Sequence, residues 1–314
     1  MVVGRRIAAA AAAGAAVWGI GHAGSPAVRR WRAGAGGSVR AGPLQVRTFG
    51  SGRPVVLLLH GMTAAGNSFG AVFDRLGGSA RVVVPDLLGF GGSMVASGPV
   101  TGDDHVVALD AMLAALGLAD EPLVVAGHSM GGPLALRFAA RHRDRVHGVV
   151  TLCAALYRDA AEADAQVTLM GPAEAVLVGD GPLPERFCRL VCRYRTVAGW
   201  VAVATRPDLP VPVALAGVQH TWDSYRGSLN GLLRTPEWES ALHRLGAAGV
   251  PVTLAEGARD PVPVPGRAAA LAAAVPTVRH LIHPTATHLM PLTEGGWCAR
   301  LITEHLDDET RRML

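Results

Sequence analysis

The chain has 314 residues, a length that suits one large catalytic domain. Half of the residues are hydrophobic and 17% are charged, which is a globular composition and excludes a disordered chain. The net charge is +4, yet residues 1–53 carry eight arginines and no acid, which leaves 21 basic and 25 acidic residues in the remainder. Because nucleic-acid binding requires a basic patch on the folded body, we expect no nucleic-acid partner.

The chain opens with a segment that resembles a secretion signal. Arg5 and Arg6 precede an alanine-rich apolar run and a group of small residues. The run is shorter than the ~20 apolar residues of a membrane span, and the arginines that follow it oppose export. Two interpretations stay open, a membrane tether or export signal through residues 5–20 and a helical extension, so localisation is undecided. Residues 1–38 are assigned to this segment, with a Gly-rich linker over 33–38.

The body of the chain alternates between predicted strands and helices. Apolar, β-branched runs predict strands that are buried on both faces, at 55–60, 81–85, 123–126, 146–152, 252–255 and 278–282. Helical patterns lie between most of them, at 103–116, 133–141, 266–274 and 295–306. This alternation predicts an α/β fold with a predominantly parallel sheet flanked by helices.

The alternation is interrupted once, over residues 156–249, where several short helical stretches replace the strands. An insertion of this length predicts a helical cap between two halves of a core, 39–155 and 250–314. Trp222 and Tyr225 in the insertion are expected to bind substrate, and ordinary packing of an amphipathic cap helix is the alternative. Two apolar stretches of the insertion, 198–204 and 211–218, favour an apolar acyl substrate.

The strongest functional motif is Gly127-His128-Ser129-Met130-Gly131. It stands at the end of a predicted buried strand and at the start of a predicted helix. In this context Gly-x-Ser-x-Gly predicts a nucleophile elbow, a sharp turn that projects the serine hydroxyl above the sheet. The glycines leave room for the helix to pack against the strand, so Ser129 is the predicted nucleophile.

This pattern resembles the α/β-hydrolase family in its serine-nucleophile branch with a cap insertion, over roughly residues 44–306. His60-Gly61-Met62 follows the first central strand, where that family places an oxyanion-hole donor. The stretch from Asp86 to Ser93 matches the family loop Asp-x-x-Gly-x-Gly-x-Ser. The resemblance implies that the backbone N–H groups of Met62 and Met130 form the oxyanion hole.

In this family the catalytic groups follow one another along the chain in the order serine, acid, histidine, so the resemblance implies that an acid and then a histidine follow Ser129. Asp260 lies in the loop after the strand that follows the insertion, beside a proline, and is preferred to Glu256. His288 opens the last loop and is preferred to His283. Histidine titrates near neutral pH, and a carboxylate behind it fixes its tautomer.

Other polar residues receive supporting roles. His60 and His128 are expected to lie near the substrate or to shape the loops around the nucleophile, and Asp86 to organise its loop. Three arginines could bind an anion or form a solvated helix face: Arg189, Arg193 and Arg195. Four cysteines are interpreted as buried thiols, namely Cys153, Cys188, Cys192 and Cys298. No metal site and no cofactor is predicted, because no neighbouring residue completes a zinc-ligand set.

The leading functional hypothesis is hydrolysis of a carboxylic ester or thioester of a small-molecule substrate through an acyl-enzyme. The same three residues also serve C–C hydrolases, lyases and eliminating enzymes of the family, so these reactions remain an alternative. Branches with a carboxylate nucleophile are disfavoured because position 129 is serine. A non-catalytic, hydrolase-like binding protein is the third hypothesis. The sequence does not indicate an oligomeric state.

Overall fold

The computed structural model describes residues 18–19, 21–95, 98 and 100–306. Its centre is one eight-stranded sheet in the order β1-β2-β4-β3-β5-β6-β7-β8, parallel except for the pairs β1–β2 and β2–β4. The strands are β1 Gly37–Ala41, β2 Leu44–Phe49, β3 Val55–Leu59, β4 Arg81–Pro85, β5 Leu123–His128, β6 Val146–Leu152, β7 Val252–Gly257 and β8 Val278–His283. The predicted α/β fold class is confirmed.

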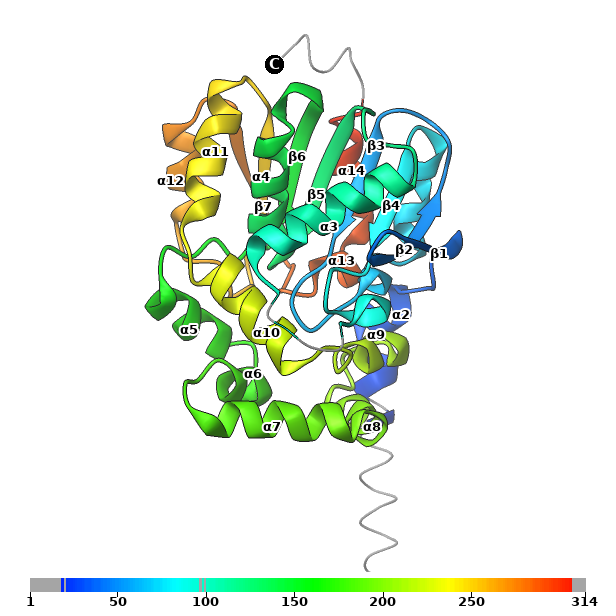
Figure 1. The fold of residues 1–314 in the computed structure, drawn as a ribbon, viewed down its shortest axis with the longest axis vertical. Helices are drawn as coiled ribbons and strands as arrows, with labels where there is room; N and C mark the ends of the chain where they lie inside the picture. Colours follow the sequence, from blue (N-terminus) through cyan, green and yellow to red (C-terminus); the bar gives the residue numbers. More distant parts are fainter. Residues whose placement is uncertain (1–17, 20, 96–97, 99, 307–314) are drawn as a thin grey trace, which may run out of the picture.

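Helices cover both faces of the sheet (Figure 1). The helices before and after the 156–249 insertion are α2 Pro26–Arg30, α3 Gly102–Ala115, α4 Gly131–Arg141, α12 Arg267–Ala274, α13 Met290–Thr293 and α14 Gly295–Thr303, and the last helix of the insertion is α11 Glu237–Ala247. Helices α3, α4 and α11 lie on one face, and α14 lies behind the sheet with the 3₁₀ segment Ala71–Gly78. Alternate residues of β3 point into the hydrophobic cores on the two faces of the sheet. Leu57 packs in the core beneath α3, α4 and α11, and Leu58 packs in the core beneath α14. The strand is therefore apolar at every position, as parallel sheets require.

Strands β1 and β2 were not predicted. Residues 33–38 were interpreted as a linker, and the first predicted strand began at residue 55. Four of the five β1 residues are exposed, so the strand has no apolar run. Edge strands bury little surface and therefore lack the pattern that marks central ones. In β2 only Leu44 and Val46 are fully buried.

The 156–249 insertion forms helices and no strand, and every residue in it is described. The helices are α5 Ala160–Thr168, α6 Pro172–Leu177, α7 Pro182–Arg193, α8 Arg195–Thr205, α9 Val211–Ala216 and α10 Trp222–Ser228, followed by a π-helical turn at Leu229–Leu233. Figure 1 shows α5 to α10 beyond the carboxyl ends of the strands. Helix α11, in contrast, packs against α4 beside the sheet. The boundary of the cap at residue 249 stays a prediction.

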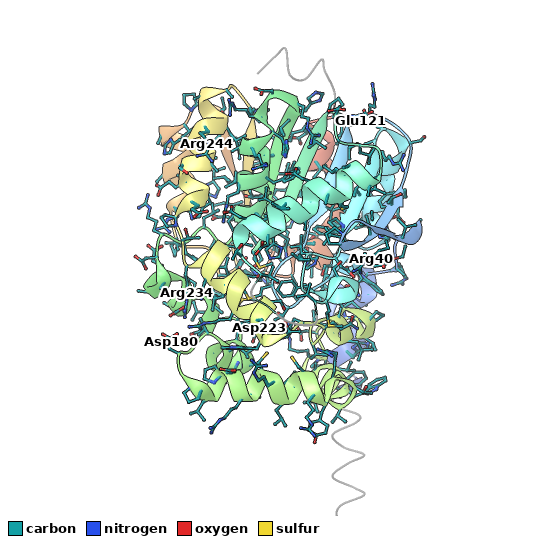
Figure 2. All side chains as sticks on the ribbon, viewed as in Figure 1. Arg40, Glu121, Asp180, Asp223, Arg234 and Arg244 are labelled. Carbon is teal, nitrogen blue, oxygen red and sulfur yellow. The ribbon has the colours of Figure 1, made fainter. Side chains whose placement is uncertain are left out.

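Ion pairs hold the cap together. The Arg234 side chain is 10% exposed and pairs with Asp164 of α5 at 2.7 Å. Arg226 of α10 pairs with Asp180, and Figure 2 shows Asp180 and Arg234 on the same side of the cap. These arginines also donate to the carbonyl oxygen of Val178. Partly buried pairs of this kind fix the cap helices relative to one another more firmly than exposed pairs do.

Only the last part of the proposed tether at residues 5–20 falls within the described residues. The Trp18 Nε1–H donates to the carbonyl oxygen of Val203 on α8 at 3.0 Å, and Ser25 Oγ donates to Asp208. Within the described residues, no helix is both long and apolar enough to cross a bilayer. The tether itself remains a prediction.

The buried His105 on α3 gives a testable pH dependence. Burial, and next the charge of His60, lower the pKa of His105 from 6.5 to about 3. Between these two pH values the unfolded chain binds the extra proton, so the free energy of unfolding falls as pH drops below 6.5, by about 1.4 kcal/mol per pH unit. In His105→Gln, the change in unfolding free energy between about pH 7.5 and about pH 5 should be smaller by about 2 kcal/mol. Urea unfolding measures it.

The control for this experiment is His243→Gln on α11, which replaces an exposed histidine. It should keep the pH dependence of the parent protein. Equal pH dependence in His105→Gln and the parent would show that His105 is not held neutral by the fold.

Candidate active site

Ser129 lies at the turn between β5 and α4 in a strained conformation. Its φ is +53°, a region that non-glycine residues rarely adopt. The turn is held by the Ser129 N–H, which donates to Leu152 at 3.0 Å, and by the Ser129 carbonyl, which accepts from Gly132 and Ala155. Strain of this kind persists only where the surroundings fix it, and it aims the side chain away from the sheet.

Glycines on either side of Ser129 allow the close approach of strand and helix. A Cβ on Gly127 would overlap the carbonyl oxygen of Gly131, and a Cβ on Gly131 would overlap that of Leu59. Any side chain at either position would push α4 away from β5 and β3. The Gly-x-Ser-x-Gly spacing is therefore a packing requirement of the turn.

Three side chains that are far apart in sequence form a hydrogen-bonded chain. His288 Nε2 lies 3.0 Å from Ser129 Oγ, and His288 Nδ1 lies 2.9 Å from Asp260 Oδ2. The Asp260 side chain is fully buried and its other oxygen accepts from the Val262 N–H at 2.9 Å. The ring therefore donates from Nδ1 to the carboxylate and accepts the serine proton at Nε2. The fold brings together the three residues predicted as nucleophile, base and acid.

The Asp260 carboxyl is kept ionised by its neighbours. Burial alone would raise its pKa, but hydrogen bonds from His288 and Val262, with the charge of His288, lower that pKa below its usual value. Burial raises the pKa of the Cys153 thiol well above its usual value, so this thiol stays protonated beside the carboxylate. Cys153 was predicted only as a buried thiol. Its contact with Asp260 was missed because nothing in the sequence pairs the end of β6 with the loop after β7.

Glu256 and His283, the alternatives to Asp260 and His288, interact with other residues. Glu256 Oε2 lies 2.8 Å from His280 Nε2, and burial raises the pKa of Glu256. His283 packs edge-on against Trp297 and lies 3.8 Å from Glu294. Neither rival is hydrogen-bonded to Ser129 or His288 within the part of the chain that the structure describes.

Two neutral histidines brace the site from behind. His128 Nε2 donates to the carbonyl oxygen of His288 at 2.8 Å, and burial lowers the pKa of His128 to about 3. His60 is fully buried. Its Nδ1 donates to Gly61 and its Nε2 accepts from the Leu87 N–H. Both were expected either to lie near the substrate or to shape the loops around the nucleophile, and both make backbone contacts that fix loops of the site.

The loop at Asp86 is fixed through both carboxylate oxygens. Asp86 Oδ1 accepts from the Gly66 N–H and Oδ2 from the Gly92 N–H, each at 2.7 Å. Gly91 adopts a φ of +53°, and a Cβ there would overlap the same carboxylate. This arrangement matches the expectation that Asp86 organises its loop.

A small cavity lies between Ser129 and the cap. Its volume is about 10 Å³, enough for about one water molecule. The lining residues are Met62, Thr63, Ser129, Ala155, Tyr157, Val167, Met170, Glu174, Tyr225, Leu233 and Val262. Tyr225, an expected substrate contact, is among them, whereas Trp222 stacks on Tyr225 with ring centroids 6.4 Å apart. Glu174 is the charged residue of the lining and was not anticipated.

The two amides expected to bind an oxyanion flank this cavity. Met62 lines it, and Met130 is the first residue after Ser129 and precedes α4. Among the described residues, neither the Met62 N–H nor the Met130 N–H donates a backbone hydrogen bond. Unused amides beside the serine are suited to stabilising negative charge.

The sequence model of the α/β-hydrolase fold matches residues 54–295. The chain belongs to the α/β-hydrolase family. Lipase LipV of Mycobacterium tuberculosis is 39% identical over 117 residues, which are 37% of this chain and 43% of the lipase. The pimeloyl-[acyl-carrier protein] methyl ester esterase of Neisseria meningitidis serogroup C is 30% identical over 215 residues, 67% of this chain and 77% of the esterase.

Solved α/β-hydrolase structures share the fold. A thermophilic esterase from Thermogutta terrifontis superposes with a TM-score of 0.62 at 24% identity, over 88% of this chain and 99% of the esterase. The matches to the first curated relatives span about half of their length or less. This α/β-hydrolase therefore belongs to the same family as these relatives. Its own reaction is inferred from the geometry of its site.

The packing of the nucleophile turn predicts a large effect of one methyl group. Gly127→Ala should lower the free energy of unfolding by about 3 kcal/mol, because the added Cβ overlaps backbone and not a flexible side chain. Gly78→Ala is the control, since a Cβ at Gly78 meets no atom within 4 Å. Urea unfolding of both variants tests this, and parent-like stability of Gly127→Ala would contradict the packing argument.

Proposed function

We propose that this protein is a serine hydrolase that cleaves a carboxylic ester or thioester of a small, mainly apolar acyl compound. The observation that carries the proposal is the continuous hydrogen-bonded chain from Ser129 through His288 to Asp260. Relatives named lipase and methyl ester esterase support an ester as the bond that is cleaved. The proposed chemistry requires no cofactor.

In the first half of the reaction, Ser129 Oγ attacks the carbonyl carbon while His288 Nε2 takes its proton. The buried Asp260 carboxylate stabilises the resulting imidazolium. The tetrahedral intermediate then collapses. The bond to the leaving oxygen or sulfur breaks, and His288 returns the proton to that atom. The acyl group remains bound to Ser129 as an ester.

In the second half, water attacks the acyl-enzyme and gives its proton to His288 Nε2. Collapse of the second tetrahedral intermediate releases the carboxylic acid, and the proton returns to Ser129 Oγ. In both intermediates the negative oxygen would accept hydrogen bonds from the Met62 and Met130 amides. Such donors are typically worth 10²–10³-fold in rate.

The cavity lining supports an apolar acyl group with a limit on negative charge. Val167, Met170 and Leu233 provide apolar surface, and Glu174 faces the same space. A volume of about 10 Å³ is too small for an acyl chain, so the cap has to shift when substrate enters. The stretches 198–204 and 211–218, which first indicated an apolar substrate, do not contribute to the lining among the described residues.

Replacing the nucleophile tests the proposal directly. Ser129→Ala should abolish covalent labelling by a fluorophosphonate probe and lower kcat for a p-nitrophenyl ester by roughly 10⁶-fold. Ser240→Ala, an exposed serine on α11, should label and turn over like the parent. Labelling that persists in Ser129→Ala would remove this serine from the mechanism.

The charge of Glu174 predicts a substrate preference. Glu174→Gln should raise kcat/KM for an ester whose acyl chain ends in a carboxylate by about fivefold relative to the neutral ester of equal length, because a repulsion of about 1 kcal/mol is removed. Glu185→Gln on α7, outside the cavity lining, is the matched control. Parallel kinetics with both esters measure this. An unchanged preference in Glu174→Gln would show that this carboxylate does not face the acyl chain.

A further inference from the structure

Two cysteines and a histidine converge inside the cap, away from Ser129. Cys188 and Cys192 lie one turn apart on α7, with their Sγ atoms 3.9 Å apart. One ligand atom from each, together with a ring nitrogen of His220, lies within 4.8 Å of the other two. Cys188 is 1% exposed and His220 is 3% exposed. No metal site was predicted from the sequence, because His220 is 28 residues from Cys192 along the chain.

We propose that Cys188, Cys192 and His220 form a binding site for a thiophilic divalent cation, with zinc as the metal that fits best. Tetrahedral zinc with Zn–S bonds of about 2.3 Å places two sulfurs ~3.8 Å apart. The observed Sγ–Sγ distance of 3.9 Å agrees with that edge. Two thiolates and one imidazole leave the fourth position to water or to another ligand.

The histidine is prepared to bind a metal. Its Nδ1 lies 3.1 Å from the carbonyl oxygen of Gly217, to which it donates, so Nε2 carries the lone pair. His220 Nε2 is buried and has no hydrogen-bond partner among the described residues. An unpaired buried nitrogen costs stability unless a ligand satisfies it. Metal-binding histidines usually donate their other N–H to a carbonyl or carboxylate in this way.

The two thiols share one proton, which metal binding would have to release. The hydrogen bond between them raises the pKa of Cys188 and, with the charges of Arg195 and Arg189, lowers the pKa of Cys192 to about 7. Burial lowers the pKa of His220 to about 4, so the ring is neutral at neutral pH. A thiolate and a neutral imidazole are the forms that bind metals. Two thiolates would balance the charge of zinc, so the neighbouring Arg195 faces a neutral complex.

The backbone around His220 is fixed from several sides. Arg195 donates to the carbonyl oxygens of Val218 and His220, at 3.0 and 2.8 Å. The Gly91 N–H donates to Gln219 at 2.8 Å, and an isolated bridge pairs His220 with Phe90. The site would join α7 to the segment that precedes α10, the helix that carries Tyr225 to the cavity. A bound metal would thus stabilise the cap over the active site.

The test uses the purified full-length protein, reduced and stripped of metal with a chelator. Cobalt(II) and then zinc are titrated against it. We expect one equivalent of cobalt to give a thiolate-to-cobalt charge-transfer absorption that zinc abolishes. Cys188→Ser, Cys192→Ser and His220→Asn should each weaken binding more than 100-fold, since changes behind the ligands alone typically cost 10–100-fold. His220→Cys should retain the absorption.

Two thiol variants serve as controls. Cys298→Ala removes a buried thiol of α14 outside the cluster and should bind like the parent. Cys153→Ala addresses the other close group of ligand atoms, Cys153 with Asp260 and His288. Loss of the absorption in Cys153→Ala, with retention in Cys188→Ser, would place the metal at the catalytic residues and overturn the proposal. So would the absence of any thiolate-to-cobalt absorption in the parent protein.

A different observation, on the opposite side of the same helix, concerns the outer surface of the cap. Helices α7 and α8 form the edge of the molecule farthest from the sheet (Figure 1). Large apolar side chains are exposed along this edge, and we call them the apolar edge: Leu183, Leu190, Tyr194, Val197, Trp200 and Val201. Leu183 is 72% and Trp200 58% exposed. Several large apolar side chains exposed on two consecutive helices are typical of an interaction site.

We infer that the apolar edge docks on an anionic lipid surface. The exposed Arg186 and Arg193 lie on α7 among the apolar residues, and such a mixture suits the boundary between lipid tails and headgroups. The start of the described chain lies beside it, since Trp18 donates to Val203 of α8. In the sequence, Arg5, Arg6 and an apolar run directly precede Trp18. A second membrane signal in the sequence would reinforce docking by the apolar edge.

Vesicle flotation of the full-length protein tests this inference. The parent should float with vesicles of phosphatidylcholine and phosphatidylglycerol, and less with phosphatidylcholine alone. The double variant Leu190→Glu, Trp200→Glu should lose at least tenfold in partitioning, while Ile282→Glu, an equally exposed apolar residue on β8, should not. Equal flotation of both variants would overturn the inference. A parent that does not float would also overturn it, whether the protein is dimeric through this edge or monomeric with the edge protected from labelling.

Discussion

The active site depends on the close approach of β5 and α4 at Ser129. Because Gly127 and Gly131 have no side chains, the helix begins directly against the strand, and the chain turns through a positive φ at the serine. This turn directs Oγ toward His288 and leaves the Met130 amide beside it. The strain is balanced by the hydrogen bond that the Ser129 N–H donates to Leu152 and by those that its carbonyl oxygen accepts from Gly132 and Ala155. The nucleophile is positioned by backbone packing rather than by a flexible side chain.

Around this turn, charge is concentrated in one place. His60, His105 and His128 are neutral because burial lowers the pKa of each. Asp260 is the exception, as its hydrogen bonds keep it ionised. The rings of His60 and His128 are hydrogen-bonded to backbone groups and that of His105 to the Ser228 hydroxyl, whereas the Asp260 carboxylate orients the imidazole that has to accept a proton. This division lets several histidines lie near the site without competing for the serine proton.

The sequence predicts most strongly where local chemistry sets the structure. The run Leu123–Ala126 followed by Gly-x-Ser-x-Gly is unambiguous because burial on both faces and the sharp turn both constrain residue type. Strand β1 is not predictable in this way, since its exposed side chains satisfy no pattern. Part of the cavity lining was also missed: Glu174 lines the same cavity as Ser129 only through the packing of α5, α6 and α10, which depends on tertiary contacts. For the same reason the proximity of His220 to two cysteines could not be read from their spacing.

Ion pairs between side chains connect the segments at which the cap joins the core. Arg158, after β6, pairs with Glu239 of α11 at 2.7 Å, and Glu162 of α5 pairs with Arg267 at 2.6 Å. Arg158 is more than half exposed, so water weakens its attraction to Glu239, and dissolved salt weakens it further, as it does for other surface ion pairs. The ease with which the cap separates from the core is therefore set in part by the electrolyte around the protein. Entry to the cavity becomes a property of the medium as well as of the polypeptide.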